Sequence, residues 1–550
     1  MKFNVFVLLT IVVIFGSFLR LWQLNKFPPG FYSDEALYGY EAYSLSKTGK
    51  DQFGNFLPLT IAGFGDYRPA FYIYFTIPFI QWFGLTEFAT RLPSALASIG
   101  TLIATFFLIR IITKSQRAAL LGTLVMVLSP WSLFFGRMAH ETNLMTLFIT
   151  SGTFFMWRAR RCSFCVVPAA ICFAASLYIY HSARAFIPLL FFMTLVLGWR
   201  LVISKKRVLW GTLLFLILLL PLLGELTKPA TWSRVQGASF WNDPGIVPYI
   251  NDGRRKAVEN GWPGFFVKIV YNKPIVYVER FGNNFFAHFD PKFLLTSGDN
   301  NGIYNTPHTG ILLWPEMLLI PLGAWVAFKK NQKLFWWIIL SVIFALIPDS
   351  LTRFAPSSPR IHLALPFTVL LSGTGLRFLL KKNRLLFLTA TVLLISSNLW
   401  FWKNYLIDLP KKHEEPWQVG AKELVRKAQI YKNTYPKIWI SRYGYGWIHL
   451  VFHTKYDPAT LQTEIRHSEP NELGFWWVSD IGNYHLDWLP EQKKMDCSTL
   501  YIAPPTEFQV PVNLVDRIKN SQNQDIFWFA EKQTCMPSNK EPVDSEKGYL

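Results

Sequence analysis

The sequence predicts an α-helical polytopic membrane protein with about eleven transmembrane helices and a C-terminal mixed α/β domain outside the membrane. Three observations lead to this fold class. Hydrophobic residues make up 51% of the 550-residue chain and charged residues only 16%, whereas about a quarter of the residues in an average soluble domain are charged. Several apolar segments are long enough to cross about 30 Å of hydrocarbon. The loops between them alternate between basic and acidic.

The predicted spans follow from apolar length, because about 20 helical residues are needed to cross a bilayer. The first apolar segment is interpreted as an uncleaved anchor, since no small-residue cleavage site follows it. The predicted spans are residues 4–24, 90–110, 118–135, 142–157, 164–181, 185–201, 208–224, 311–328, 334–348, 362–380 and 385–402.

Five of the connecting loops are basic and contain no Asp or Glu. The positive-inside rule places such loops in the cytoplasm and therefore places the acidic loops on the outer side. The net charge of +20 thus reflects membrane orientation rather than nucleic-acid binding. The five basic loops are residues 110–117, 158–161, 200–207, 329–333 and 381–384.

Residues 70–84 form a further apolar segment, but it has only about 15 residues where roughly 20 are needed to cross. Counting it as a crossing would move every later basic loop to the outer side. We therefore expect an interfacial or re-entrant helix, and its Tyr and Trp residues are typical of the membrane boundary.

The domain organisation follows from these spans. Residues 1–402 form the membrane domain, with long outer loops at 25–89 and 225–310. Residues 403–550 contain 18 Lys and Arg against 19 Asp and Glu and no apolar run of span length, so we expect a water-soluble extracytoplasmic domain. Residues 437–452 and 475–481 are typical of strands, and residues 416–432 of an amphipathic helix.

The five cysteines give two open questions. Cys162 and Cys165 form a CxxC motif that could bind a metal, but no second pair accompanies them, so free cysteines are favoured. Cys497 and Cys535 lie in the expected outer domain, where an oxidising environment permits a disulfide. The sequence leaves open whether they pair.

Ionisable residues gather in the outer loops, and charge so close to a bilayer indicates a functional site. The strongest candidates are Asp34 and Glu35, which directly follow the first span. Single charges at helix ends can also be merely solvated, and Glu141 could simply pair with Arg137 one turn away. The further candidates are Asp66, Arg68, Arg137, His140, Glu141, Arg184, Asp299, His308, Arg353, Arg360 and His362.

These residue types suit group transfer from a lipid-linked phosphate. Arg360 and His362 open directly onto the N-terminus of a predicted helix, and the helix dipole and guanidinium groups both favour phosphate. A carboxylate such as Asp34 can deprotonate an acceptor hydroxyl. The sequence contains no Walker motif or nucleotide-binding pattern, so a cytoplasmic nucleotide donor is not expected.

With these residues in place, the chain resembles the polytopic glycosyltransferases of the GT-C fold, in particular the protein O-mannosyltransferase and aminoarabinose transferase superfamily. The resemblance covers residues 1–402 and rests on Asp34-Glu35, on Asp66 to Pro69, on residues 84–96, on Arg137 with Glu141, and on His288 to Asp299. It implies a polyprenyl-phosphate-linked sugar donor and a multi-pass protein of the plasma membrane.

The resemblance also implies roles for individual residues. Asp34 would be the catalytic base, and Glu35 would act beside it. Arg68, Arg353, Arg360 and His362 would contact the carrier phosphate. The remaining candidates would position the acceptor or carrier: Asp66, Arg137, His140, Glu141, Arg184, Asp299 and His308.

Several points stay open at this stage. The acceptor hydroxyl could belong to a protein, a glycan or a lipid, and the sequence neither requires nor excludes a divalent cation. The alternative functions are a transporter or flippase of lipid-linked glycans and a ligase that uses such glycans. The confinement of acidic residues to outer loops argues against transport, since transporters place ionisable groups near the bilayer midplane.

Overall fold

The computed structural model describes residues 4–64, 67–202, 205–228, 232, 236–443, 446–469 and 476–533. Each predicted span contains a helix, so the mostly helical architecture with several apolar helices is confirmed, and the number of crossings stays a prediction. The helices that match the spans are α1 (Val5–Leu21), α4 (Glu87–Thr113), α5 (Gln116–Leu128), α7 (Glu141–Arg158), α8 (Val166–Leu177), α9 (His181–Val202), α10 (Lys205–Leu226), α15 (Glu316–Lys330), α16 (Gln332–Ser350), α17 (Leu365–Lys382) and α18 (Arg384–Lys403).

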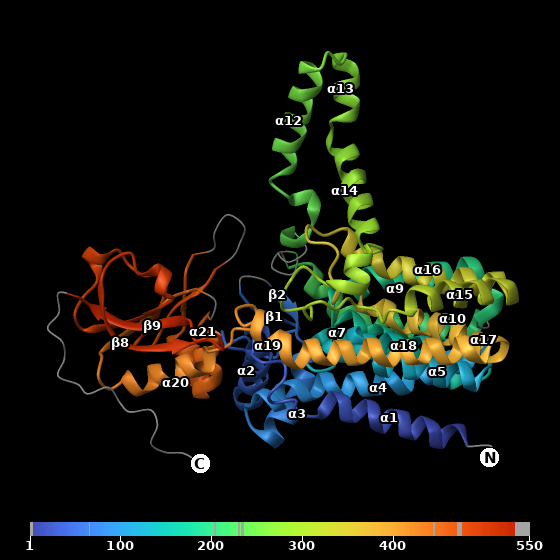
Figure 1. Cartoon of the computed structure of the whole chain (residues 1–550), viewed down its shortest axis with the longest axis horizontal. Coiled ribbons are helices and arrows are strands. Elements are labelled where there is room, and N and C mark those ends of the chain that lie inside the picture. The colour runs from blue at the N-terminus through green and yellow to red at the C-terminus, as the bar shows by residue number, and fades with distance from the viewer. Residues whose placement is uncertain are drawn as a thin grey trace.

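These helices lie side by side in one bundle (Figure 1). Within the described part of the chain, five helical stretches are long and apolar enough to cross a membrane on their own, and four shorter apolar helices accompany them. One predicted span differs in detail. Residues 118–135 are divided into α5 and the short α6 (Pro130–Phe135), because Pro130 begins a new helix that Ser129 caps.

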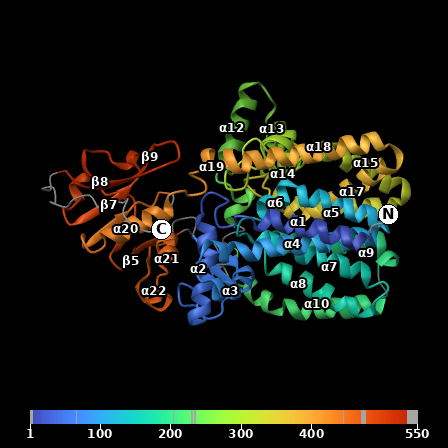
Figure 2. The ribbon, with the colours of Figure 1, turned by 60° about the horizontal axis from the view of Figure 1, so that its bottom comes forward.

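The first outer loop gathers at one end of this bundle. It contains α2 (Ser33–Thr48), the β1–β2 hairpin (Thr60–Ala62 and Tyr67–Pro69) and α3 (Phe71–Phe83). Helix α2 starts with two acidic residues, which the helix dipole favours in a first turn, and ends at Gly49, whose φ of 68° suits a glycine C-cap. Helix α3 packs against α2 and α4 at the end of the bundle (Figure 2).

The second outer loop forms a helical arm that projects across the direction of the bundle helices (Figure 1). The arm consists of α12 (Ile246–Glu259), α13 (Gly264–Val270) and α14 (Lys273–Ala287). Its small core is formed by Ile246, Ile250 and Val276.

The C-terminal domain is built on a seven-stranded mixed sheet with strand order β4-β5-β6-β3-β7-β9-β8. Helices α20 (Ala421–Tyr431), α21 (Gly446–Thr454) and α22 (Pro458–Glu464) accompany the sheet. The strands are β3 (Lys437–Ile440), β4 (Arg466–His467), β5 (Val478–Ile481), β6 (Tyr484–Leu486), β7 (Thr499–Ala503), β8 (Val512–Lys519) and β9 (Asp525–Lys532).

The predicted helix at 416–432 and the predicted strand at 475–481 are confirmed in α20 and β5. The predicted strand over residues 437–452 is wrong in its second half, where α21 begins at Gly446. Its β-branched and aromatic residues favour a strand. However, α21 buries Trp447, Ile448 and Phe452 and packs on α2, and this packing overrides the local preference.

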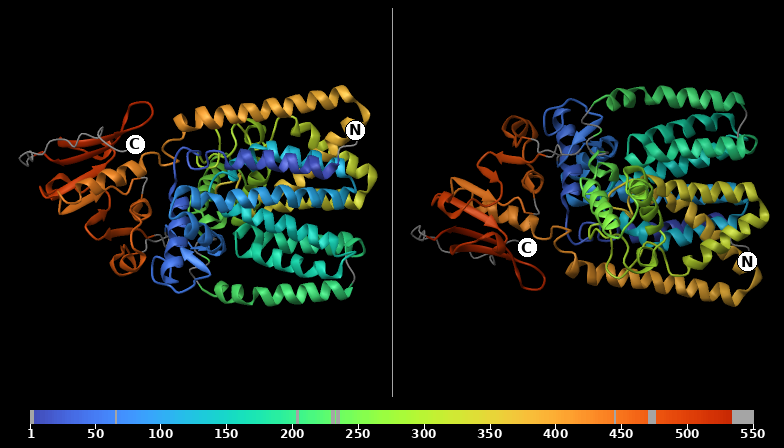
Figure 3. Two further views of the ribbon diagram at one scale, coloured as in Figure 1. Left: turned by 90° about the horizontal axis from the view of Figure 1, so that it is seen from below. Right: turned by 90° about the horizontal axis from the view of Figure 1, so that it is seen from above.

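The C-terminal domain is joined to the bundle through α18, η5 (Asn404–Asp408) and α19 (Leu409–Lys412) (Figure 3). It also packs directly on α2. The Tyr40 hydroxyl donates to the Tyr456 carbonyl at 3.0 Å, and the Phe31 and Phe452 ring centroids are 4.7 Å apart. The domain therefore lies at the end of the bundle that carries the Asp34 loop.

The cysteine question is partly answered. Cys497 is disulfide-bonded, whereas Cys162, Cys165 and Cys172 are free. Cys535, the expected partner of Cys497, lies outside the described residues.

The fold predicts the membrane topology of the chain. An alkaline phosphatase fused after Trp402 should be active, because α3 is expected not to cross and eleven predicted spans then place Trp402 on the outer side. A fusion after Lys382, one predicted span earlier, is the matched control and should be inactive. Activity at Lys382 and not at Trp402 would contradict the topology.

Candidate active site

Asp34 lies in the first turn of α2 and forms an ion pair with Arg68 of the β1–β2 hairpin. The Arg68 Nη1 to Asp34 Oδ1 distance is 2.8 Å. The Arg68 side chain is 8% exposed and that of Asp34 is 18% exposed, so the carboxylate is ordered by its partner and still reachable. The pair brings together two predicted site residues that are far apart in sequence.

Glu35 is the next residue, but it is fully buried. Both of its oxygens bind Arg91 of α4, at 3.0 and 2.7 Å, and one also accepts the Ala139 N–H at 2.7 Å. A carboxylate enclosed in this way cannot take a proton from a substrate, which must come within hydrogen-bond reach of the base. The structure therefore does not support the predicted catalytic role of Glu35 and gives it a positioning role.

Glu141 and His140 meet the Asp34 pair at the N-terminus of α7. The Tyr38 hydroxyl donates a short hydrogen bond to Glu141. Burial raises the pKa of Tyr38, and the nearby charges of Glu141 and Asp34 raise it further. His140 caps α7 by accepting the Thr142 N–H at 3.3 Å. Asp34, Arg68, Tyr38 and Glu141 thus form one polar cluster, here called the Asp34 cluster.

Tyr304, from the loop after the arm, completes this cluster. Its ring centroid lies 5.6 Å from that of His140. Burial raises the pKa of Tyr304, and the proximity of Asp34 adds to the effect. Sequence reasoning missed both tyrosines. Tyr38 could have been found, because it follows Asp34 by four residues and so lies on the same face of the helix.

A second polar cluster surrounds Asp349 at the end of α16. Asp349 is fully buried and pairs with Arg360 Nη1 at 3.0 Å and with His288 Nε2 at 2.8 Å, and it accepts the Ser357 N–H at 2.7 Å. The Arg360 side chain remains 26% exposed. Arg360 is thus half-buried, and its Nη1 is held by Asp349, the Thr352 hydroxyl and the Phe354 carbonyl. We call this the Asp349 cluster.

The other two predicted phosphate ligands of this region do not fit their expected role. Arg353 donates to the backbone carbonyls of Ser239 and Asn242 and so fastens the start of the arm. His362 is buried, with Nδ1 at 2.8 Å from the Thr146 hydroxyl. Because its ring packs between Trp131 and Phe135, it belongs to the helix packing.

Arg137 is also buried and structural. It donates to the carbonyls of Leu19 and Trp22, each at 2.8 Å, which holds the turn after α1. Arg184 donates to the Leu177 carbonyl at 3.1 Å and contacts His181. Backbone carbonyls take donors of Arg137, so its predicted positioning of acceptor or carrier is not supported. The predicted role of Arg184, which gives one donor to a carbonyl and one to His181, stays a prediction.

Asp299 connects the two clusters. It accepts hydrogen bonds from the Ser358 N–H at 2.7 Å and the Ser358 hydroxyl at 3.1 Å. The same hydroxyl also lies 3.3 Å from the Tyr304 carbonyl. The Tyr304 loop is thereby fixed against the turn that carries Arg360. Asp299 positions backbone rather than substrate.

His308 lies apart from both clusters. Its Nε2 is 2.6 Å from Lys412 Nζ, so it contacts the linker to the C-terminal domain. Asp66, the remaining candidate, lies outside the described residues.

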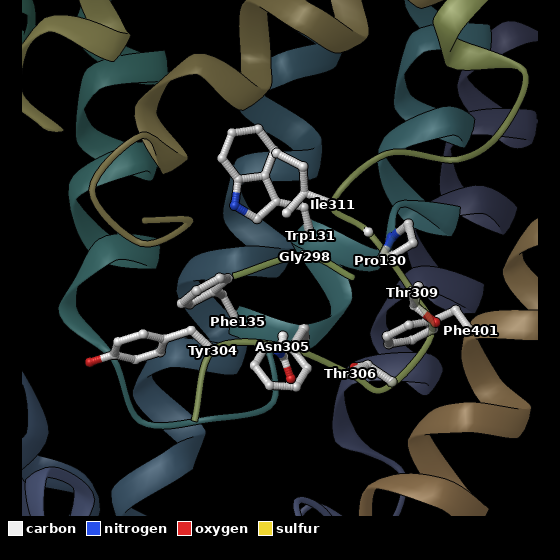
Figure 4. Close-up of a pocket in the computed structure, with 12 residues that line it drawn as sticks. Pro130, Trp131, Phe135, Gly298, Tyr304, Asn305, Thr306, Thr309, Ile311 and Phe401 are labelled. Carbon is white, nitrogen blue, oxygen red and sulfur yellow. The ribbon is translucent and has the colours of Figure 1, made fainter. Parts of the chain in front are cut away.

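A small cavity of ≈ 20 Å³ lies behind Tyr304, between Trp131, Phe135 and Thr309 (Figure 4). It has room for about one water molecule, and the Tyr304 hydroxyl points away from it (Figure 4). It is too small for a sugar. Among the residues that the structure describes, no group of three or more His, Cys, Asp or Glu side chains is placed to hold a metal ion.

Comparisons with known proteins agree with the predicted superfamily. Residues 10–227 match the family model described as dolichyl-phosphate-mannose-protein mannosyltransferase. The structure resembles that of ArnT from Cupriavidus metallidurans in the apo state, with 14% identity, a TM-score of 0.53, and 96% of this chain and 97% of that chain covered.

The same enzyme bound to undecaprenyl phosphate gives 14% identity and a TM-score of 0.54, with 97% of this chain and 99% of that chain covered. At this identity the structural likeness shows a shared fold. No curated protein matches the chain significantly in sequence. The predicted resemblance is confirmed.

The geometry predicts a large structural effect at Arg91. Arg91→Ala should destabilise the protein by about 3–5 kcal/mol, because it leaves the Glu35 carboxylate buried without its counter-charge. Thermal unfolding in detergent and the yield of folded protein measure the effect. Lys422→Ala is the control, since it breaks an ion pair with Glu87 in which the lysine side chain is 74% exposed, and exposed pairs contribute little. An equal loss of thermal stability in both variants would contradict the structural role of the Glu35–Arg91 pair.

Proposed function

We propose that this protein, a membrane glycosyltransferase with the GT-C fold, moves a sugar from a polyprenyl-phosphate carrier to an acceptor hydroxyl on the outer side of the membrane. The observation that carries the proposal is the Asp34–Arg68 pair. It places a partly exposed carboxylate 2.8 Å from a guanidinium group, at the end of the bundle where α2, the β1–β2 hairpin and the C-terminal domain meet.

The proposed reaction is a single displacement at the anomeric carbon of the sugar. Asp34 accepts the proton of the acceptor hydroxyl, and the hydroxyl oxygen forms the new bond to the anomeric carbon. The bond between this carbon and the phosphate oxygen breaks, and the polyprenyl phosphate leaves with the bonding electrons. A cation near that oxygen stabilises the developing charge.

The arginines supply that cation. Arg68 lies directly beside the base, and Arg360 keeps part of its guanidinium group accessible. Arg360 approaches from the turn that Asp299 ties to the Tyr304 loop, and Tyr304 in turn lies in the Asp34 cluster. Guanidinium groups bind phosphate through paired hydrogen bonds. We assign Arg68 to the leaving phosphate oxygen and Arg360 to the remainder of the phosphate.

The nature of the donor is supported by the comparisons. The matched family is described by its use of dolichyl-phosphate-mannose, and the second ArnT structure contains undecaprenyl phosphate. A polyprenyl-phosphate sugar is therefore the proposed donor for this chain. The acceptor is a hydroxyl of a protein, a glycan or a lipid.

Asp34→Asn should reduce the transfer of label from a radioactive polyprenyl-phosphate hexose by about 10²–10⁴-fold, because the reaction loses its general base. The assay uses purified protein with a membrane extract as the source of acceptor. Asp290→Asn, which removes an exposed carboxylate of the outer loops, should leave transfer unchanged. A transfer rate above one tenth of wild type in Asp34→Asn would rule out Asp34 as the general base.

Arg360→Ala should raise the KM for the donor about tenfold or more with a smaller change in kcat, because the phosphate is bound in the ground state as well as in the transition state. Arg255→Ala is the control, since Arg255 lies on the arm with its side chain 64% exposed. Steady-state kinetics over a range of donor concentrations measure both constants. An unchanged KM with a collapsed kcat would contradict this role.

A further inference from the structure

A large basic cavity lies at the end of the bundle opposite the Asp34 cluster. Helix α4 begins at Glu87 beside the α2 region and runs for 27 residues to Thr113, a rise of about 40 Å. The cavity opens at its far end, between the ends of α4, α5 and α7, and its volume is ≈ 1280 Å³. It is thus separate from the proposed active site.

The lining of this cavity combines cations with apolar walls. No Asp or Glu lines it, and none of its cations forms an ion pair with a described acidic residue. Phe107, Phe154 and Ile111 supply apolar surface, and the two Phe ring centroids are 5.8 Å apart. The six cations are Arg110, Lys114, Arg117, Arg158, Arg160 and Arg161.

Trp157 also lines the cavity and is only 9% exposed. Its indole nitrogen is out of contact with solvent, so the ring adds apolar wall rather than a donor. The positive-inside rule accounts for basic residues in these loops, but it does not account for a space of ≈ 1280 Å³ that six of them line together with aromatic side chains.

The protein also holds the cavity wall in place. Arg207 donates to the carbonyls of Ala159 and Arg160, at 2.8 and 3.1 Å. This contact fixes the turn that carries Arg158, Arg160 and Arg161, so the guanidinium groups are gathered around the cavity even though like charges repel. Such an arrangement lowers the cost of ordering the site when an anion binds.

We propose that this cavity binds an anionic phospholipid of the cytoplasmic leaflet whose headgroup carries two phosphates. Six cations exceed the need of a single phosphate diester, and basic pockets between transmembrane helices on the cytoplasmic side suit headgroups of this kind. The cavity also has an apolar wall, formed by Phe107, Ile111 and Phe154. Acyl chains of a lipid can pack on such a wall, whereas a soluble anion has no apolar part to do so. Each bound phosphate replaces the repulsion among the arginines by charge-assisted hydrogen bonds.

The full-length protein, purified in a neutral detergent and stripped of lipid, is titrated with four probes. These are tetraoleoyl cardiolipin, dioleoyl phosphatidylglycerol, dioleoyl phosphatidylcholine and inorganic pyrophosphate. Native mass spectrometry gives the bound lipid and its apparent affinity, and thermal unfolding gives the stabilisation. Three variants are compared with wild type: Arg158→Gln/Arg161→Gln, Trp157→Phe, and the control Lys381→Gln/Lys382→Gln.

Cardiolipin should bind most tightly and raise the unfolding temperature. Each cation near a membrane surface contributes about fivefold in affinity, so Arg158→Gln/Arg161→Gln should bind cardiolipin about 25-fold more weakly. Trp157→Phe keeps an aromatic wall and removes a nitrogen that does not reach the cavity, so it should bind cardiolipin as wild type does. Lys381→Gln/Lys382→Gln removes the same charge from exposed positions of another basic loop and should bind as wild type does.

Three outcomes would overturn the proposal. Equal affinity for phosphatidylcholine and cardiolipin would show that the charge of the headgroup does not determine binding. Equal stabilisation by pyrophosphate would show a site for soluble anions. Equal weakening in Lys381→Gln/Lys382→Gln would show that only the overall charge of the cytoplasmic face matters. None of these outcomes bears on sugar transfer, so the proposal stands or falls independently of the proposed function.

Discussion

The buried ion pair between Glu35 and Arg91 holds the arrangement on which the candidate active site depends. Arg91 donates to both Glu35 oxygens and to the carbonyls of Leu24 and Pro28. It therefore fastens α2 and the turn after α1 to α4 at the same time. A buried pair is a weak source of stability but is costly to break. Its consequence here is a fixed orientation of α2.

This orientation separates the roles of two adjacent carboxylates. Neighbouring residues on a helix point about 100° apart, because 3.6 residues complete a turn. Once Glu35 points into the bundle toward Arg91, Asp34 points toward the β1–β2 hairpin and meets Arg68. Glu35 is enclosed, and its charge is neutralised by Arg91, whereas Asp34 stays partly exposed beside Arg68. Environment rather than residue type separates the proposed base from its neighbour.

The two ends of the bundle are chemically different. At one end, acids and arginines are paired in the Asp34 and Asp349 clusters, and the C-terminal domain packs on α2 through Tyr40, Phe31 and their partners. At the other end, the cations around the ≈ 1280 Å³ cavity lack acidic partners among the described residues. Charged groups held in a fixed geometry suit the proposed transfer chemistry, whereas an excess of one sign suits the binding of a counter-charged lipid.

Apolar length and loop charge were sufficient to predict the helices of the bundle, because each is a local property that a bilayer selects for. The number of crossings, the interfacial place of α3 and the start of the C-terminal domain stay predictions. Apolar length and loop charge were also sufficient to select Asp34, Arg68 and Arg360 as candidates. They could not separate these from Glu35, Arg137, Arg353 and His362, which have the same chemistry and similar positions in the loops. The proposed separation of their roles rests on the tertiary structure, because partners from distant segments occupy the latter four. Such partners cannot be read from one stretch of sequence.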